Sequence, residues 1–336
     1  MTMVGISSII LEPLADTVWR NQTFSTEFIL LGFGNLPQLQ ILLFLLFLVI
    51  YIVTMTGNIL IVALVMADQY LHTPMYFFLG NLSCLETCCA STTLPRMLAS
   101  FLTEDRTISV QVCIAQLDFF GSLVAVKCCL LSVMSYDLYL AICKPLQYAV
   151  LMNGSLCFWL AAGSWVSGFV ACTITEYWIS QMIFHGPSEI DHIFCDYNPL
   201  VKLSCSDTSL MDLVTFLFSS ILTLSPVLLT LASYVCIIAT IQRIPSTTGR
   251  QKAFSTFSSH LIVVTFYHGT LIFIYLLPGT NTLRELHKVF SLFYTVLTPL
   301  VNPLIYSLRN KKVKEALRKA VSEIMNFMTN SKLFCM

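Results

Sequence analysis

Long apolar segments recur along this chain, and a more polar stretch separates each one from the next. A helix needs roughly 20 apolar residues to cross the hydrocarbon core of a bilayer. Seven segments reach about that length, near residues 39–66, 75–98, 108–138, 157–175, 212–241, 258–277 and 289–308. We therefore expect an all-α membrane protein built as a seven-transmembrane helix bundle.

The composition agrees with lipid as the outer solvent. Apolar residues make up 56% of the chain and charged residues 11%, whereas soluble domains carry about 25% charged residues. The 18 basic and 18 acidic residues cancel, so the overall charge gives no indication of nucleic-acid binding. Most of the 13 cysteines lie in or beside apolar segments without zinc-ligand spacing. We expect them to pack as small side chains, and we expect no metal or cofactor.

The distribution of lysine and arginine predicts the orientation. With the amino terminus outside, most basic residues fall in the inner loops and the tail, as the positive-inside rule requires. The chain then divides into an extracellular segment (1–38), a membrane domain (39–308) and a cytoplasmic tail (309–336). Acidic residues gather on the outer side, in a solvated loop or at a functional face: Glu176, Glu189, Asp191, Asp196, Asp207 and Asp212.

Both ends of the chain carry a further pattern. Asn21-Gln22-Thr23 matches the glycosylation pattern and would lie outside, so Asn21 is a predicted glycosylation site. Past residue 308, apolar and basic residues separate onto two faces of a predicted helix. This pattern favours an amphipathic helix on the inner leaflet over a plainly solvated one. The apolar face holds Val313, Ala316, Leu317, Ala320, Val321 and Ile324.

Six motifs stand in order at the ends of the predicted spans. They are Gly57-Asn58, Leu71-His72-Thr73-Pro74-Met75-Tyr76-Phe77-Phe78, Met134-Ser135-Tyr136-Asp137 with Ala141-Ile142-Cys143, Ser204-Cys205-Ser206-Asp207-Thr208, Lys252-Ala253-Phe254-Ser255-Thr256 with Ser259-His260-Leu261, and the stretch from Pro299 to Asn310. Together they resemble vertebrate odorant receptors of the rhodopsin-like, G-protein-coupled class, over about residues 21–320. The resemblance implies a plasma-membrane receptor that binds a small odorant and activates a stimulatory heterotrimeric G protein.

The resemblance also implies a disulfide and a ligand pocket. Cys113 and Cys195 match the family's bond between the outer loop and the bundle. The matching pocket positions lie in the outer half, between the third, fifth, sixth and seventh spans. They are Phe120, Gly121, Val124, Phe218, Ser219, Leu222, His268, Leu271, Ile272, Tyr275 and Thr295. This mostly apolar lining suits a small hydrophobic molecule, although any one of these residues could instead serve helix packing.

One pocket residue departs from the family, because His268 stands where tyrosine is usual. An imidazole can donate or accept a hydrogen bond. We expect His268 to favour a ligand with a polar end. Asp118 is the other ionisable residue near this predicted pocket, and it is isolated in the sequence.

Several inner residues match the family's conformational switch. Pro303 removes a backbone donor next to Asn302 and loosens the last span, which lets it bend. Tyr234 and Tyr306 carry hydroxyls that can change partners. Each feature could be a static kink or a buried tyrosine, and the resemblance favours the switch.

The inner end of the 108–138 span departs from the family, which has Asp-Arg-Tyr there. This chain has Asp137, Leu138 and Tyr139. Leucine forms neither an ion pair nor a charge-assisted hydrogen bond. A folded but signalling-impaired receptor is therefore the alternative to an active one.

A second departure lies deeper in the membrane. Glu86 matches an acidic residue of the family's sodium site, and Lys127 replaces a second carboxylate. A lone lysine in mid-membrane costs roughly 2.5–3.5 kcal/mol on insertion scales. We expect the Lys127 ammonium to occupy the place of the sodium ion and pair with Glu86, which would lock one conformation. Snorkelling or deprotonation of Lys127 is the alternative.

Two other classes of protein fit the sequence less well. Seven spans do not divide into the equal inverted halves that are typical of many transporters. The sequence also lacks the nucleophile–base and phosphate-binding motifs of enzymes.

Overall fold

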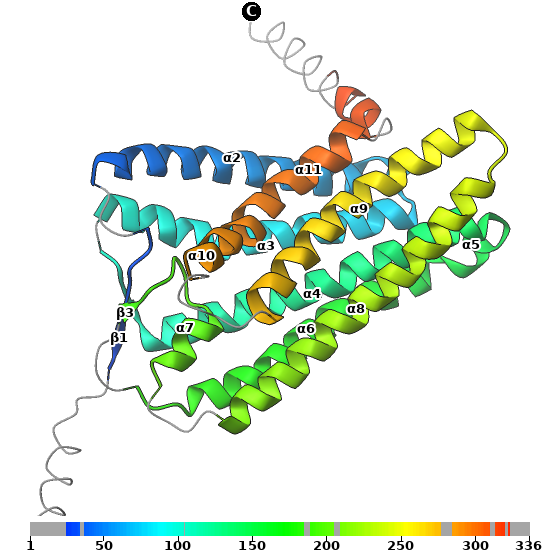
Figure 1. Ribbon diagram of the computed structural model, residues 1–336. Coiled ribbons are helices and arrows are strands. Elements are labelled where there is room, and N and C mark those ends of the chain that lie inside the picture. Colours follow the sequence, from blue (N-terminus) through cyan, green and yellow to red (C-terminus); the bar gives the residue numbers. More distant parts are fainter. Residues whose placement is uncertain are drawn as a thin grey trace, which may run out of the picture.

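The computed structural model describes residues 25–33, 37–103, 105–184, 189–204, 209–276, 284–309, 313–319 and 322. Long helices run side by side through this part of the chain (Figure 1). They are α2 (Pro37–Ala67), α3 (Pro74–Thr103), α4 (Val110–Cys143), α6 (Gly154–Ser180), α8 (Ser209–Arg243), α9 (Thr247–Leu276) and a last helix formed by α10 (Arg284–Leu292), η3 (Phe293–Leu297) and α11 (Thr298–Arg309). The predicted helical bundle is confirmed.

Within the described residues, six of these helices are long and apolar enough to cross a membrane. The remaining member of the bundle, α3, has 30 residues, and polar side chains interrupt its apolar sequence. It buries several of them, among them Ser83, Glu86 and Thr93, inside the bundle. A helix that turns its polar residues inward can still cross a bilayer, because only its lipid-facing side must be apolar.

Several helices extend past the predicted apolar segments. The 258–277 segment, for example, belongs to α9, which begins at Thr247. Its first turns contain Arg250 and Gln251, which lipid would not accept but water does. The hydropathy pattern therefore marks the membrane-embedded part of α9 and misses its polar extension.

Helix α4 lies at the centre of the bundle and packs against α3, α6 and α8. Its contact with α6 depends on Gly168, where the two backbones approach closely. A Cβ atom on residue 168 would lie 2.8 Å from the Val126 backbone nitrogen and 2.9 Å from the Ser122 carbonyl oxygen. Glycine at 168 therefore sets how near α6 comes to α4, which fits the use of small residues between membrane helices.

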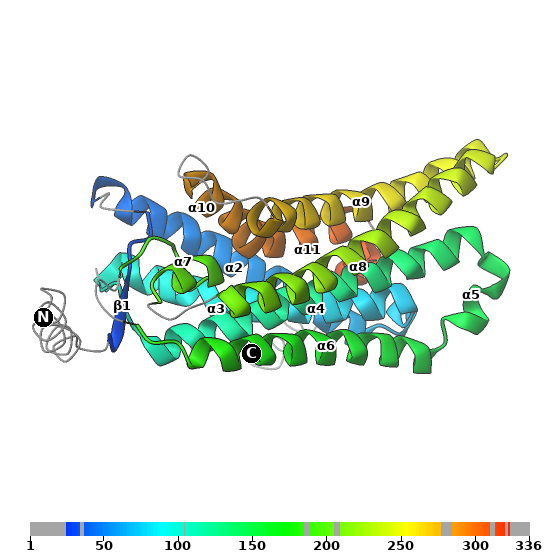
Figure 2. The same cartoon turned by 60° about the horizontal axis from the view of Figure 1, so that its bottom comes forward.

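A small sheet lies at one end of the bundle, which we call the sheet end. Its strands are β1 (Glu27–Leu30), β2 (Thr107–Ser109) and β3 (Glu189–Ile190), in the order β2-β1-β3. The short helix α7 (Tyr197–Lys202) lies beside them (Figure 1). Helix α5 (Pro145–Leu151) lies at the opposite end, which we call the α5 end (Figure 2). The single turn η1 (Gln69–Leu71) joins α2 to α3.

The last helix contains a π-helical segment at Phe293–Leu297. Pro299 follows after Thr298 and has no backbone N–H to donate. The Thr298 hydroxyl donates to the Phe293 carbonyl (2.9 Å), and the Asn58 side-chain amide of α2 donates to the Pro299 carbonyl (3.0 Å). These bonds satisfy carbonyl groups around an irregular stretch, as membrane helices require.

Residues 313–319 form a helical turn after α11. Val313 and Ala316 are buried against an apolar cluster that includes Ile61 of α2 and Leu79 of α3. The described part of the predicted amphipathic helix therefore packs its apolar face on the bundle and is not plainly solvated. Ala320 and Val321 of the same predicted face lie outside the described residues.

Candidate ligand cavity and buried charge cluster

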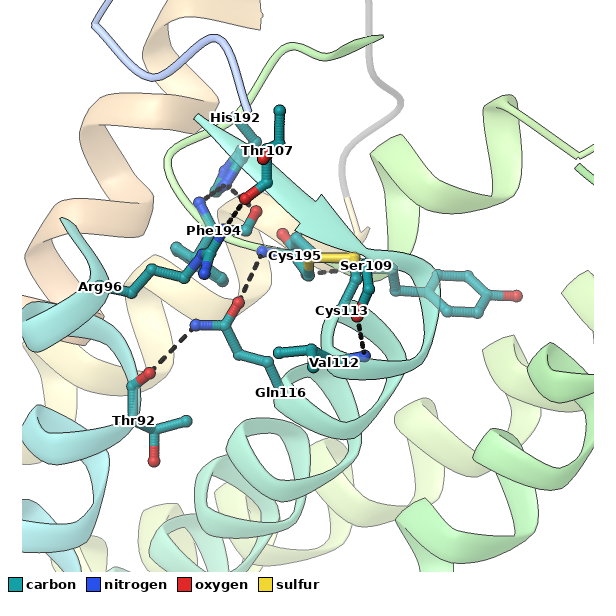
Figure 3. The surroundings of a disulfide bond; sticks show 12 residues. Thr92, Arg96, Thr107, Ser109, Val112, Cys113, Gln116, His192, Phe194 and Cys195 are labelled. Carbon is teal, nitrogen blue, oxygen red and sulfur yellow. Dashed lines mark hydrogen bonds between the residues drawn. A yellow bond between two sulfur atoms is a disulfide. The ribbon is translucent and has the colours of Figure 1, made fainter. Parts of the chain in front are cut away.

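A disulfide joins Cys113, near the start of α4, to Cys195, just before α7 (Figure 3). The Cα atoms of the two cysteines are 5.5 Å apart, and 82 positions separate them in the sequence. The Gln116 amide donates to the Thr92 carbonyl of α3 (3.0 Å), and its oxygen accepts the Cys195 N–H (3.3 Å). The predicted disulfide is confirmed, and it fixes the loop to both α3 and α4.

The same loop also contacts the last helix. The two ring nitrogens of His192 lie 3.1 Å from the Phe194 carbonyl oxygen and 3.2 Å from the Ser291 hydroxyl of α10. Burial lowers the pKa of His192, so the imidazole is neutral near pH 7. The Lys288 ammonium of α10 lies 2.5 Å from an Asp191 carboxyl oxygen. The loop therefore spans the sheet end from α4 to α10.

A cavity of about 410 Å³ lies near this loop. Its wall comes from α4, α6, α7 and α8, with Leu271 from α9. The volume and the mostly apolar wall are typical of small-molecule sites. Five predicted pocket residues are in its lining: Gly121, Val124, Ser219, Leu222 and Leu271.

Of the other predicted pocket residues, the five whose side chains the structure describes do not line this cavity. Phe120 packs its ring against Phe194 (5.2 Å between centroids), and Phe218 is 37% exposed. His268 is buried, with Nδ1 3.1 Å from the Val264 carbonyl oxygen of its own helix, and the Thr295 hydroxyl donates to the Ser291 carbonyl. Ile272 is half-buried, and the Tyr275 side chain lies outside the described residues. Ligand contact at these six positions stays a prediction.

The difference in lining has a structural reason. The sequence placed the pocket between the third, fifth, sixth and seventh spans, whereas this cavity lies mainly between α4, α6 and α8. Helix α6 contributes residues that the sequence did not place in the pocket: Cys172, Thr175, Glu176 and Ile179. The polar residues Thr175 and Glu176 at the end of an apolar segment could have indicated that this helix contributes to the pocket. The span predicted from the sequence ends at residue 175, however, and places Glu176 in the loop.

Glu86 and Lys127 form a buried ion pair between α3 and α4. The Lys127 Nζ atom lies 2.5 Å from Glu86 Oε1, and both side chains are at most 2% exposed. The Asn302 amide of α11 donates to the same carboxyl oxygen (2.5 Å). Lys127 Nζ also lies 4.5 Å from the centre of the Tyr267 ring of α9, within cation–π range. The predicted pair is present, and Lys127 does not snorkel to the surface.

Three of the predicted switch residues, Asp137, Leu138 and Tyr139, lie in the last turns of α4, toward the α5 end. Leu138 is buried in the main apolar cluster, and the Tyr139 ring stacks on Tyr136 (6.3 Å). Asp137 accepts a hydrogen bond of 2.8 Å from the Tyr148 hydroxyl of α5. Burial, together with the neighbouring Asp137 carboxylate, raises the pKa of Tyr148, which keeps its hydroxyl protonated as the donor.

Two further switch residues have defined contacts. The Tyr234 hydroxyl lies 2.7 Å from Nδ1 of His260 on α9. Pro303 packs against Gly57 of α2, where an added Cβ would lie 3.2 Å from the proline Cβ. The Tyr306 side chain and the predicted glycosylation site at Asn21 lie outside the described residues.

Comparisons with known proteins agree with this architecture. The family model described as olfactory receptor matches residues 47–324. Human olfactory receptor 6B1 is 47% identical over 299 residues, which cover 89% of this chain and 96% of the relative. Mouse olfactory receptor 5AP2 is 48% identical over 300 residues, which cover 89% and 95%. Human olfactory receptor 10A7 is 46% identical over 306 residues, which cover 91% and 97%.

The chain belongs to the olfactory receptor family. It is therefore a G-protein-coupled receptor of the seven-transmembrane type and a multi-pass plasma-membrane protein. Helix α3 is therefore also a transmembrane helix, in addition to the six described helices that are long and apolar enough to cross a membrane. Family membership also excludes the enzyme class and the transporter alternative.

Proposed function

We propose that this olfactory receptor binds a small, largely hydrophobic odorant in the cavity between α4, α6 and α8 and signals through a stimulatory heterotrimeric G protein. The observation that carries the proposal is the cavity itself, which combines a volume of about 410 Å³ with a mostly apolar wall. The disulfide-tied loop holds α7 beside it. A rigid, preformed site of this kind suits a small ligand with few polar groups.

The same proposal orients the protein in the membrane. The Cys113–Cys195 disulfide lies at the sheet end, and disulfides persist in oxidising compartments. We place the sheet end and residues 1–38 outside the cell, residues 39–308 in the seven-helix domain, and the α5 end with residues 309–336 inside. The basic residues at the α5 end, such as Lys144 and Arg250, support this orientation.

The α5 end also supports coupling to a partner. A groove of about 580 Å³ lies between α8 and α9, lined by residues that include Ile241, Gln242 and Arg250. A groove with mixed apolar and polar walls suits a helix of a partner protein. Leu138 cannot offer the charge that arginine brings at this position in the family, so we infer that neighbouring groups carry the contact.

A cyclic-AMP assay tests this function. Cells expressing the receptor with an amino-terminal tag are first stained without permeabilisation, which tests the orientation and surface delivery. They are then exposed to a panel of volatile compounds, in parallel with a Leu138→Arg variant. We expect ligand-evoked cyclic AMP from the unmodified receptor and a larger response from the variant.

Two other outcomes would contradict the proposal. A response in Leu138→Arg alone would identify the natural chain as the signalling-impaired alternative. Surface-exposed receptors that respond to no volatile in either form, and that bind none when purified, would remove the odorant-receptor function.

A further inference from the structure

Two acidic side chains from different helices meet in the wall of the ligand cavity. Asp118 of α4 and Glu176 of α6 both line it, and their carboxyl groups lie within hydrogen-bonding reach of each other. The Oδ1 atom of Asp118 is buried, and no hydrogen-bond partner lies within reach in the described part of the chain. The cavity therefore contains an acceptor atom that the described residues leave unsatisfied.

The charged residues that line the described part of the cavity wall are all acidic. Asp196, which is buried, also lines the cavity. Among the described residues, no lysine, arginine or histidine side chain lines the cavity. Two other lysines of the bundle already have acidic partners, because Lys127 pairs with Glu86 and Lys288 pairs with Asp191.

Two carboxyl groups in contact cannot both stay ionised without a cation between them. A ligand's ammonium group can be that cation, since its three N–H donors can reach both carboxylates at once. The low dielectric of a mostly apolar cavity strengthens this attraction relative to water.

We propose that the ligands of this receptor include small primary amines, whose ammonium group binds between Asp118 and Glu176 while the apolar part extends toward Val124, Leu222 and Leu271. The inference rests on the proposed function, because it assigns a ligand class to the same cavity. The three apolar residues line the cavity together with the acidic pair. An amine with one short aliphatic or aromatic group matches this division into a charged end and an apolar end.

Matched pairs of ligands test the proposal. Benzylamine is compared with benzyl alcohol, and hexylamine with hexanol, so that each pair differs in the head group alone. Binding is read from the shift in melting midpoint of the purified receptor, which does not depend on G-protein coupling, and cyclic AMP is measured in cells. We expect the amines to raise the midpoint at concentrations about tenfold lower than the alcohols.

Two isosteric variants locate the binding site. Asp118→Asn and Glu176→Gln are each expected to weaken amine binding by about tenfold or more, which is the effect of losing a charged hydrogen-bond acceptor. Alcohol binding should change little. Glu27→Gln in β1 removes an exposed carboxylate at the same end of the bundle and serves as the control that leaves amine binding unchanged.

The outcomes separate this inference from the proposed function. If neutral volatiles shift the midpoint and the amines do not, or if amine binding survives both variants, the amine assignment is wrong and the odorant cavity stands. If neither amines nor neutral volatiles bind, the proposed function fails as well.

Discussion

Glu86 and Asp118 are acidic residues on neighbouring helices that both face the interior of the bundle, but their surroundings differ. Glu86 receives a lysine ammonium from α4 and an amide N–H from α11, and it is fully shielded from solvent. Asp118 faces a second carboxyl group and an open cavity. Among the described residues, a lysine thus supplies the cation for Glu86, whereas no basic side chain lines the cavity beside Asp118.

This difference suggests separate roles for the two sites. A charge pair inside a membrane bundle ties helices together, because separating it would leave both charges uncompensated. The Glu86 cluster joins α3, α4 and α11 in this way. An acidic site beside a cavity holds no helices together and is free to bind a ligand. We propose that the first site fixes the arrangement of the bundle and that the second selects the ligand.

The largest expected effect follows from removing Lys127, the cation that pairs with Glu86. Lys127→Met should destabilise the receptor by about 3–5 kcal/mol, because the Glu86 carboxylate then stays buried without its partner. Surface expression and the melting midpoint of detergent-purified protein measure this loss. The matched control is the double variant Glu86→Gln with Lys127→Met, which should recover most of the stability. Equal stability of all three forms would contradict the role of the pair.

A smaller effect is expected where α6 approaches α4, since this contact holds Glu176 near Asp118. Gly168→Ala should destabilise the receptor by about 1–3 kcal/mol, because the new methyl group overlaps the α4 backbone. Gly163→Ala on the same helix is the control, as nothing lies within 4 Å of its Cβ position. Identical melting midpoints for the two variants would show that the close contact is unimportant.

The smallest effect concerns a third acidic residue, Asp137, whose partner is a hydroxyl group. Tyr148→Phe removes the 2.8 Å hydrogen bond to this carboxylate and should lower stability by about 1–2 kcal/mol. Tyr139→Phe keeps the ring that stacks on Tyr136 and is the matched control. A midpoint for Tyr148→Phe as high as that of the control would mean that the bond contributes nothing measurable.

Features governed by hydropathy and by membrane energetics could be predicted from the sequence. The apolar segments located the helices because lipid imposes a minimum length and excludes charge. Lys127 and Glu86 could be paired because a lone charge in the membrane is costly. The disulfide came from resemblance and not from spacing, since 82 positions separate its cysteines.

The wall of the cavity could not be predicted in the same way. Periodicity does not tell which face of an apolar helix turns toward its neighbours, so α6 was not expected to contribute. Glu176 was placed in a loop because a charge usually marks the end of a membrane span, whereas α6 continues to Ser180. Asp118 was isolated in the sequence, and only the packing of α6 on α4 brings a second carboxyl group to it.

The most direct test compares the melting midpoints of two ligand-free variants, Glu86→Gln and Asp118→Asn, under identical conditions. Each replaces a carboxyl group by an amide of the same size. We predict a clear fall for Glu86→Gln, because the Lys127 ammonium loses its counter-charge, and an unchanged or higher midpoint for Asp118→Asn, because the new amide can donate an N–H to the Glu176 carboxyl group. Equal falls in both variants, or a fall for Asp118→Asn alone, would contradict the distinction between the Glu86 site, which stabilises the bundle, and the Asp118 site, which is available to a ligand.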